Sequence, residues 1–129
     1  MLVSQVLLID DNPVQLSVRE TVLRRAGFSV SVATTADSAL ATLRILKDRI
    51  SVVVTDHVMP GRNGAEFVRQ LRQENQLVPV IVLSGMPEAE SEYEGLNVVF
   101  RQKPVPPPEL IALIRVSVAD NGNDQAGAA

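Results

Sequence analysis

The stretch 52–64, VVVTDHVMPGRNG, constrains the fold of this chain more than any other segment. It opens with three consecutive valines, and such a run of β-branched residues is typical of a strand that is buried on both faces. The run ends at Asp56, and turn-forming Pro-Gly and Asn-Gly pairs follow it. A buried parallel strand that ends in a carboxylate places that group at the sheet edge where open α/β proteins keep their binding sites. We therefore expect Asp56 to belong to such a site.

Four further segments have the composition of β-strands. Residues 6–9 and 80–83 are continuous aliphatic runs, which suits central strands of a parallel sheet. Residues 28–32 alternate between apolar and serine side chains, and residues 98–100 form a short apolar run, so both segments fit the edges.

Helical patterns separate these strands. The first helix is expected to begin at Asn12-Pro13, with Val14, Val18 and Val22 as its apolar face. Leu16 falls off that stripe, so it is interpreted either as a docking point for a partner helix or as an isolated exposed leucine. Residues 86–95 hold four Glu and predict at most a short exposed helix. Further helices are expected after Thr34 or Thr35, after Asn63 and after Pro108.

Five strands that alternate with five helices at short spacing predict a doubly wound parallel sheet with helices on both faces. We expect an α/β, flavodoxin-like (βα)5 fold with strand order 2-1-3-4-5, because this order places the three strongest runs at the centre. The length of 129 residues suits one domain, predicted for residues 1–118. Residues 119–129 are rich in Asn, Asp, Gly, Gln and Ala and are predicted to form a disordered tail.

Composition excludes several classes of protein. The net charge is −3 without a Lys/Arg cluster, which argues against a nucleic-acid surface. The absence of cysteine excludes disulfides and thiolate metal sites. No apolar run approaches the roughly 18 residues of a membrane span, and the first residues lack the basic segment of a secretory signal. We expect a cytoplasmic protein that binds neither nucleic acid nor membranes.

The expected strand order brings polar residues together at one edge. The first, third and fourth strands are neighbours, and they end at Asp10-Asp11, Asp56 and Ser84, while Lys103 follows the fifth strand. Three carboxylates in one small site repel each other unless a cation is bound, and an all-oxygen set favours Mg²⁺. A hydroxyl and an ammonium group complete a site for a phosphoryl group, since phosphoryl transfer needs mainly positioning and charge stabilisation.

Four motifs lie at the strand ends: Asp10-Asp11, Asp56-x-x-Met59-Pro60-Gly61-x-Asn63-Gly64, Ser84-Gly85 and Lys103-Pro104. Together they resemble the receiver domain of two-component response regulators. The resemblance spans about residues 5–118 and implies a regulatory domain that is phosphorylated on aspartate and then switches conformation to regulate a partner. The phosphoryl donor would be a histidine kinase or a histidine phosphotransfer domain, and a homodimer is left open. Such a domain catalyses only its own phosphorylation and dephosphorylation.

The resemblance also implies a role for each residue around the phosphoryl group. Asp56 would accept the phosphoryl group. Asp11, Asp56 and the backbone carbonyl of Val58 would bind Mg²⁺ directly, and Asp10 would act mainly through a metal-bound water. Lys103 would pair with a phosphate oxygen, and its bond to the following proline would be cis.

The switch residues show departures from the family pattern. Ser84 would be the switch hydroxyl, and the aromatic switch position falls on Phe100, which has no hydroxyl group. The segment between Ser84 and Lys103 is short, so we expect a reduced fourth helix. Val58 and Met86 would flank the phosphate entrance, and neither can orient a water molecule, so we expect slow hydrolysis of the phosphoaspartate.

Simpler interpretations exist for each residue taken alone. Acidic residues suit the first turn of a helix, which accounts for Asp10-Asp11. Asp56 and Ser84 are compatible with an ordinary strand end, and Lys103 with a solvated charge. His57 is interpreted as a loop or partly buried residue rather than a catalytic one.

Two other functions are compatible with parts of the pattern. A Mg²⁺-dependent phosphatase of the haloacid dehalogenase type also uses an Asp nucleophile, but it needs Asp-x-Asp after the first strand, and here the two acids are adjacent. A pseudo-receiver that never takes phosphate would act as a pure interaction module, and the complete acidic set argues against it.

Overall fold

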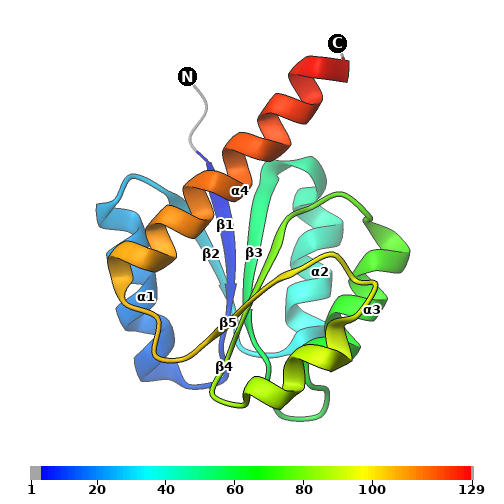
Figure 1. The fold of residues 1–129 in the computed structure, drawn as a ribbon. Coiled ribbons are helices and arrows are strands. Elements are labelled where there is room, and N and C mark those ends of the chain that lie inside the picture. The colour runs from blue at the N-terminus through cyan, green and yellow to red at the C-terminus, as the bar shows by residue number, and fades with distance from the viewer. Residues whose placement is uncertain (1–3, 129) are drawn as a thin grey trace.

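The computed structural model describes residues 4–128, and the side chains of residues 4–119. Its centre is one five-stranded parallel sheet with strand order β2-β1-β3-β4-β5 (Figure 1). This arrangement confirms the predicted flavodoxin-like order and the edge positions of the second and fifth strands. The strands are β1 (Gln5–Ile9), β2 (Ser29–Ala33), β3 (Ile50–Asp56), β4 (Val80–Ser84) and β5 (Val99–Gln102).

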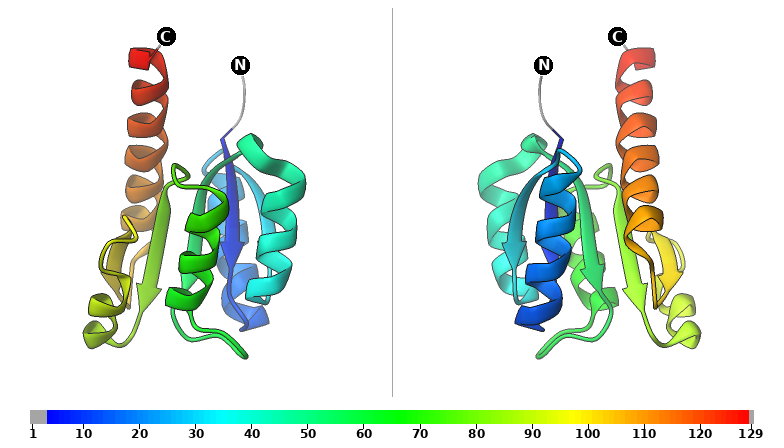
Figure 2. Two further views of the ribbon diagram at one scale, coloured as in Figure 1. Left: turned by 90° about the vertical axis from the view of Figure 1, so that its right-hand side faces the viewer. Right: turned by 90° about the vertical axis from the view of Figure 1, so that its left-hand side faces the viewer.

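Helices cover both faces of the sheet, so the molecule has three layers (Figure 2). Helices α1 and α4 lie on one face, and α2 and α3 lie on the other. A 3-10 helix, η2, replaces the fourth helix of the repeating pattern, which agrees with the short helix expected there. The helical elements are α1 (Pro13–Arg25), α2 (Ala36–Leu46), η1 (Lys47–Arg49), α3 (Gly64–Glu74), η2 (Pro87–Tyr93) and α4 (Pro107–Ala128).

Capping residues begin three of the helices where the sequence predicts them. The Asn12 side chain accepts hydrogen bonds from two backbone amides of α1, and Thr35 caps α2 in the same way. Asn63 and Glu66 form a reciprocal capping box at the start of α3. Because these caps satisfy amides that have no partner within the helix, they fix where each loop from the carboxyl edge of the sheet becomes helical.

The buried side chains form one cluster on each face of the sheet. Under α2 and α3 the cluster is centred on Phe67, which is fully buried, and on the inward side chains of β1 and β3. Under α1 and α4 it includes Leu23, Ile81 and Ile114, which are also fully buried. Both faces of the central strands are therefore covered, as their aliphatic runs predict.

The apolar face predicted for α1 is wrong. Val14 and Val18 are 71% and 57% exposed, whereas Leu16 is 7% exposed and Leu23 is fully buried. The two leucines lie seven positions apart and share a face of the helix, and their larger side chains bury more apolar area against the sheet than the valine stripe would. Leu16 belongs to the core and is not available for docking a partner.

The backbone of the last helix, α4, is assigned as helical to Ala128, and residue 129 lies outside the described residues. The disordered tail expected for residues 119–129 stays a prediction. No proline follows residue 108, so nothing interrupts the helical hydrogen bonds. The domain boundary at residue 118 stays a prediction. Within residues 4–128, no helix combines the length and hydropathy that crossing a membrane requires.

Candidate functional site

The strand register brings polar residues to one level at the carboxyl edge of the sheet. Ile9 pairs with Thr55, so Asp10 and Asp56 follow at the same height on β1 and β3. Leu83 of β4 pairs with Asp56, so Ser84 comes one residue further along. Each of these residues directly follows or ends a buried strand, and the loops after β1 and β3 lead into the capped helices α1 and α3.

Three carboxylates converge at this edge. One oxygen from each of Asp10, Asp11 and Asp56 lies within 4.8 Å of the others. Asp10 is 1% exposed and Asp56 is 4% exposed, whereas Asp11 faces solvent. The hard oxygens of three carboxylates match the ligand preference of Mg²⁺, so these residues fit the cation that the sequence implies.

Lys103 reaches one of these carboxylates from the loop after β5. Its Nζ lies 3.0 Å from Asp56 Oδ1, and its side chain is 30% exposed. Its backbone amide donates a hydrogen bond to the Ser84 carbonyl at 2.7 Å, which continues the β4–β5 pairing beyond the strands. The Lys103-Pro104 peptide bond is cis, as the sequence comparison implies.

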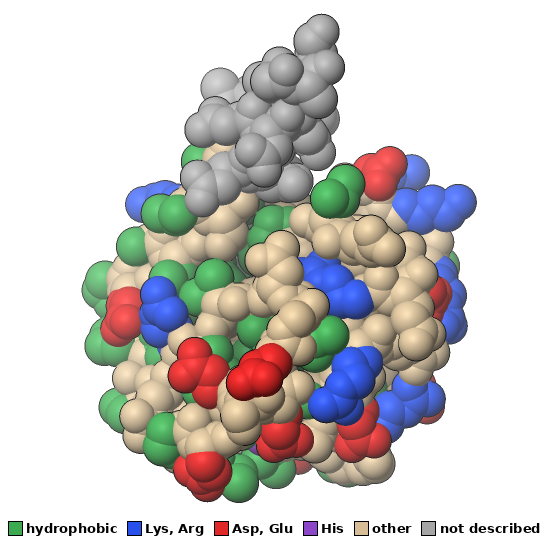
Figure 3. Space-filling view, turned by 45° about the vertical axis from the view of Figure 1, so that its right-hand side comes forward, with side chains coloured by type: hydrophobic (Ala, Val, Ile, Leu, Met, Phe, Trp, Pro, Cys, Tyr) green, Lys and Arg blue, Asp and Glu red, His purple; other side chains and the backbone are tan. Residues whose placement is uncertain are grey.

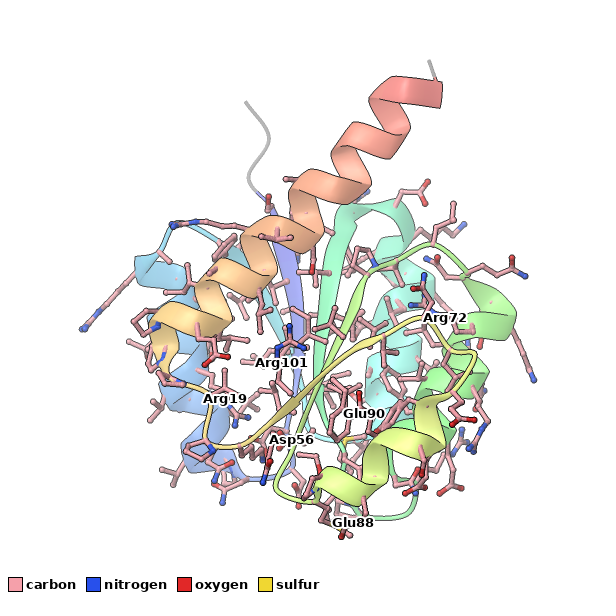
Figure 4. The ribbon with its side chains drawn as sticks, viewed as in Figure 1. Arg19, Asp56, Arg72, Glu88, Glu90 and Arg101 are labelled. Carbon is pink, nitrogen blue, oxygen red and sulfur yellow. The ribbon has the colours of Figure 1, made fainter. Side chains whose placement is uncertain are left out.

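Arg19 is a member of the site that the sequence interpretation missed. Its Nη1 lies 2.8 Å from Asp10 Oδ2 and 3.2 Å from Asp56 Oδ1, so one nitrogen bridges two carboxylates. Arg19 extends from α1 toward the end of β3, where Asp56 lies (Figure 4). It stands three residues after Leu16 and four before Leu23, on the face of α1 that turns toward the sheet. The incorrect choice of apolar face for α1 therefore concealed it.

Burial raises the pKa of Asp56 to about 6, and the neighbouring Asp10 carboxyl group adds to the rise. Arg19 and Lys103 oppose this rise, because positive charges favour the ionised carboxylate. Removal from water therefore outweighs the two cations in the metal-free site. Asp56 is mainly ionised near pH 7 but loses its charge in mildly acidic solution.

Ser84 ends β4 at the same edge of the sheet, and Phe100 lies on the neighbouring strand β5. The Ser84 hydroxyl accepts a hydrogen bond from the backbone amide of Met86 at 2.9 Å, so it is engaged with its own loop rather than with Asp56. The Phe100 ring is partly buried, and its centroid lies 5.8 Å from that of Tyr93 in η2. The predicted switch positions thus border the segment that connects β4 to β5.

The two apolar residues that are expected to flank the phosphate entrance are both exposed. Val58, in the loop after β3, is 61% exposed, and Met86, in the loop after β4, is 42% exposed. Beyond Met86, the four glutamates of 88–94 are exposed, as their sequence predicts, and acidic side chains are prominent on the lower part of the face in Figure 3.

The residue after Asp56 is buried rather than solvated. His57 is 4% exposed, and its Nδ1 lies 2.6 Å from the hydroxyl oxygen of Tyr93, which is also 4% exposed. The His57 Nε2 lies 3.4 Å from Glu92. These are the single histidine and the single tyrosine of the chain. Their spacing of 36 residues carries no recognised motif, so sequence reasoning had no signal with which to pair them.

Comparison with known proteins agrees with this arrangement. A family model described as the response regulator receiver domain matches residues 6–115, which is most of the chain. This chain belongs to the response regulator receiver domain family. The resemblance to this family that the sequence indicates is therefore confirmed.

Two curated relatives illustrate the family. The receiver domain is 38% identical over 116 residues to the C4-dicarboxylate transport transcriptional regulatory protein DctD of Pseudomonas aeruginosa, covering 87% of this chain and 24% of the relative. It is 30% identical over 125 residues to the DNA-binding response regulator MtrA of Mycolicibacterium smegmatis, covering 95% of this chain and 54% of the relative. The chain thus spans between about a quarter and half of the length of these relatives.

Solved structures show the same fold. The chemotaxis response regulator CheY4 of Vibrio cholerae has a TM-score of 0.80 and 26% identity, covering 90% of this receiver domain and 99% of that chain. A response regulator receiver domain protein of Clostridium thermocellum has a TM-score of 0.87 and 23% identity, covering 93% and 98% of the two chains. The second likeness supports the fold alone.

Proposed function

We propose that this receiver domain accepts a phosphoryl group on Asp56 from a histidine kinase or a histidine phosphotransfer domain. An oxygen of the Asp56 carboxylate attacks phosphorus, and the phosphorus–nitrogen bond of the donor phosphohistidine breaks. The imidazole leaves with the bonding electron pair and takes up a proton, while an acyl phosphate forms on Asp56. The domain acts as a regulatory switch that catalyses only its own phosphorylation and dephosphorylation, and we expect it to work in the cytoplasm.

The environment of Asp56 is the observation that carries this proposal. Its carboxylate is nearly buried and lies 3.0 Å from the Lys103 ammonium group. Lys103 would hold an oxygen of the incoming phosphoryl group and offset its charge. Bound Mg²⁺, held by Asp11, Asp56 and the Val58 carbonyl with Asp10 assisting, would supply further positive charge at the same point.

The conformational response would begin at Ser84. Its hydroxyl now accepts a hydrogen bond from the Met86 amide and donates one to the Met86 carbonyl oxygen at 3.3 Å, and a phosphoryl group on Asp56 would offer it a stronger, charged acceptor. Exchange of one acceptor for the other would draw the loop before η2 inward and shift the packing of Phe100. Phosphorylation would thereby bias an equilibrium between two conformations, which a partner protein distinguishes.

Covalent phosphorylation tests this proposal directly. The chain would be incubated with a small phosphodonor, such as acetyl phosphate, with Mg²⁺ or with EDTA, and its intact mass measured. We expect one phosphoryl adduct with Mg²⁺ and little with EDTA. Asp56→Ala should abolish the adduct, whereas Asp48→Ala, which removes an exposed carboxylate in η1, should retain it. An equal adduct on Asp56→Ala would reject the assignment, and multiple turnover of small phosphoesters would favour a hydrolase instead.

A further inference from the structure

Arg19 enters the acidic site from α1, although none of the receiver motifs includes it. Its side chain is 20% exposed, while the two carboxylates that it contacts are 1% and 5% exposed. A single guanidinium nitrogen lies 2.8 Å from Asp10 and 3.2 Å from Asp56. A positive charge therefore stands between two of the three carboxylates that are expected to hold the metal.

This contact stabilises the metal-free site. Asp10 and Asp56 are largely removed from water, so their mutual repulsion is screened less than it would be at the surface. Lys103 contacts Asp56, and Arg19 bridges Asp56 to Asp10. Arg19 thus supplies the counter-charge that allows the two acids to lie together without a metal ion.

The same contact opposes metal binding. A divalent cation bound to these carboxylates would meet the positive charge of Arg19, so each cation weakens the binding of the other. With all groups ionised, three carboxylates face two cationic side chains, and the metal-free site carries a single negative charge. Addition of a divalent ion makes the site positive, and withdrawal of Arg19 restores neutrality. Electrostatics therefore favours exchange of one cation for the other.

We propose that Arg19 is a built-in counter-ion that competes with Mg²⁺ for Asp10 and Asp56 and so sets the metal concentration at which the site becomes occupied. This inference rests on the proposed function, because it takes the acidic site to be the Mg²⁺ site. It adds a residue outside the family motifs that tunes metal affinity in this receiver domain. Arg19 is a positioning residue in this scheme, because it acts through the two carboxylates.

Mg²⁺ affinity is the first test. The full chain would be titrated with MgCl2 at constant ionic strength and pH 7.5, and amide chemical shifts would be followed by NMR. We expect Arg19→Met, which keeps an apolar stem without charge, to bind Mg²⁺ about tenfold more tightly than the wild type. The matched control is Arg25→Met, which removes an exposed charge from the end of the same helix and should stay within about twofold of the wild type.

Stability is the second test, because a merely structural role would give a different result. In EDTA, Arg19→Met should unfold at a lower denaturant concentration than the wild type, since its carboxylates lack a counter-charge. In saturating MgCl2 the two proteins should unfold at the same denaturant concentration, because the bound metal replaces the lost positive charge. If Arg19→Met does not fold, Arg19→Lys keeps a shorter cation, and both effects should be smaller but in the same direction.

The outcomes separate this inference from the proposed function. Equal Mg²⁺ affinity of the wild type and Arg19→Met would overturn the competition while leaving Mg²⁺-dependent phosphorylation intact. An equal loss of stability with and without Mg²⁺ would assign Arg19 a packing role and also overturn it. If Arg25→Met increased the Mg²⁺ affinity as much as Arg19→Met, the effect would come from the net charge of the chain and not from the Arg19 contact, and the inference would be overturned. Absence of saturable Mg²⁺ binding by both the wild type and Arg19→Met would overturn the proposed metal site itself.

Discussion

The imidazole Nδ1 of His57 lies 2.6 Å from the hydroxyl oxygen of Tyr93, and both side chains are buried. His57 follows Asp56 in the chain, and Tyr93 ends η2, so this hydrogen bond joins the backbone of the acidic site to the segment between β4 and β5. Gly64 completes the contact, because a Cβ at this position would collide with the Tyr93 hydroxyl and lie 2.8 Å from the Asp56 carbonyl oxygen. The glycine of the Asn63-Gly64 pair thus makes room for the tyrosine.

Tyr93→Phe should destabilise the domain by about 1–2 kcal/mol, because it leaves a buried ring nitrogen of His57 without its partner. Denaturant unfolding at pH 7.5 would measure the loss. A double-mutant cycle with His57→Phe separates the hydrogen bond from packing, and we expect the two single losses to be strongly non-additive. Fully additive losses would show that the two side chains do not interact energetically.

The raised pKa of Asp56 predicts a pH-dependent cost to stability in the metal-free domain. The unfolded chain loses this proton near the ordinary pKa of 3.8, and the folded chain loses it near pH 6, so the folded state holds the proton more tightly between these values. Stability should therefore fall as the pH rises from about 4 to about 6, by roughly 2–3 kcal/mol for this group.

Asp56→Asn tests that cost, because the amide does not ionise. In EDTA, we expect Asp56→Asn to be more stable than the wild type at pH 7.5 and to lose this advantage at pH 4. Asp48→Asn, which alters an exposed carboxylate in η1, should show no such pH-dependent gain. Denaturant midpoints at the two pH values provide the measurement, and an equal advantage of Asp56→Asn at both would contradict the assigned pKa.

Val58→Asn should accelerate loss of the phosphoryl group from Asp56, by roughly tenfold or more, because an amide at the rim can orient an attacking water. Val58 is 61% exposed, so the substitution leaves the core intact. The phosphorylated chain would be freed of donor, and its decay followed by intact mass. Val14→Asn alters another exposed valine, on α1, which is 71% exposed, and this variant should lose the phosphoryl group at the wild-type rate. Unchanged decay in Val58→Asn would show that the rim residue does not limit hydrolysis.

The sheet and most helix starts could be predicted because they depend on local patterns. Aliphatic runs and capping residues such as Asn63 act over a few positions, and the strand order follows from the strength of the runs. The face of α1 could not be chosen in this way, because Val14 and Leu16 both belong to regular apolar spacings and only the packing against the sheet decides between them. Arg19 was missed for the same reason, since its role becomes visible only once Leu16 and Leu23 define the inward face.

Non-local contacts account for the rest of what the sequence did not predict, and Arg72 of α3 provides a quantitative case. Burial lowers its pKa, and its guanidinium group donates hydrogen bonds to backbone carbonyls of the segments before β4 and before β5. Arg72→Met should cost about 2–3 kcal/mol in denaturant unfolding, because four backbone carbonyls, three of them in partly buried hydrogen bonds, lose charged donors. Arg69→Met, one turn earlier, breaks one exposed contact to Glu92 and should cost less than about 0.5 kcal/mol. The acceptors of the Arg72 guanidinium group are the carbonyls of Asn75, Val78, Leu96 and Asn97. Equal losses of stability in the two variants would contradict a specific role for these hydrogen bonds.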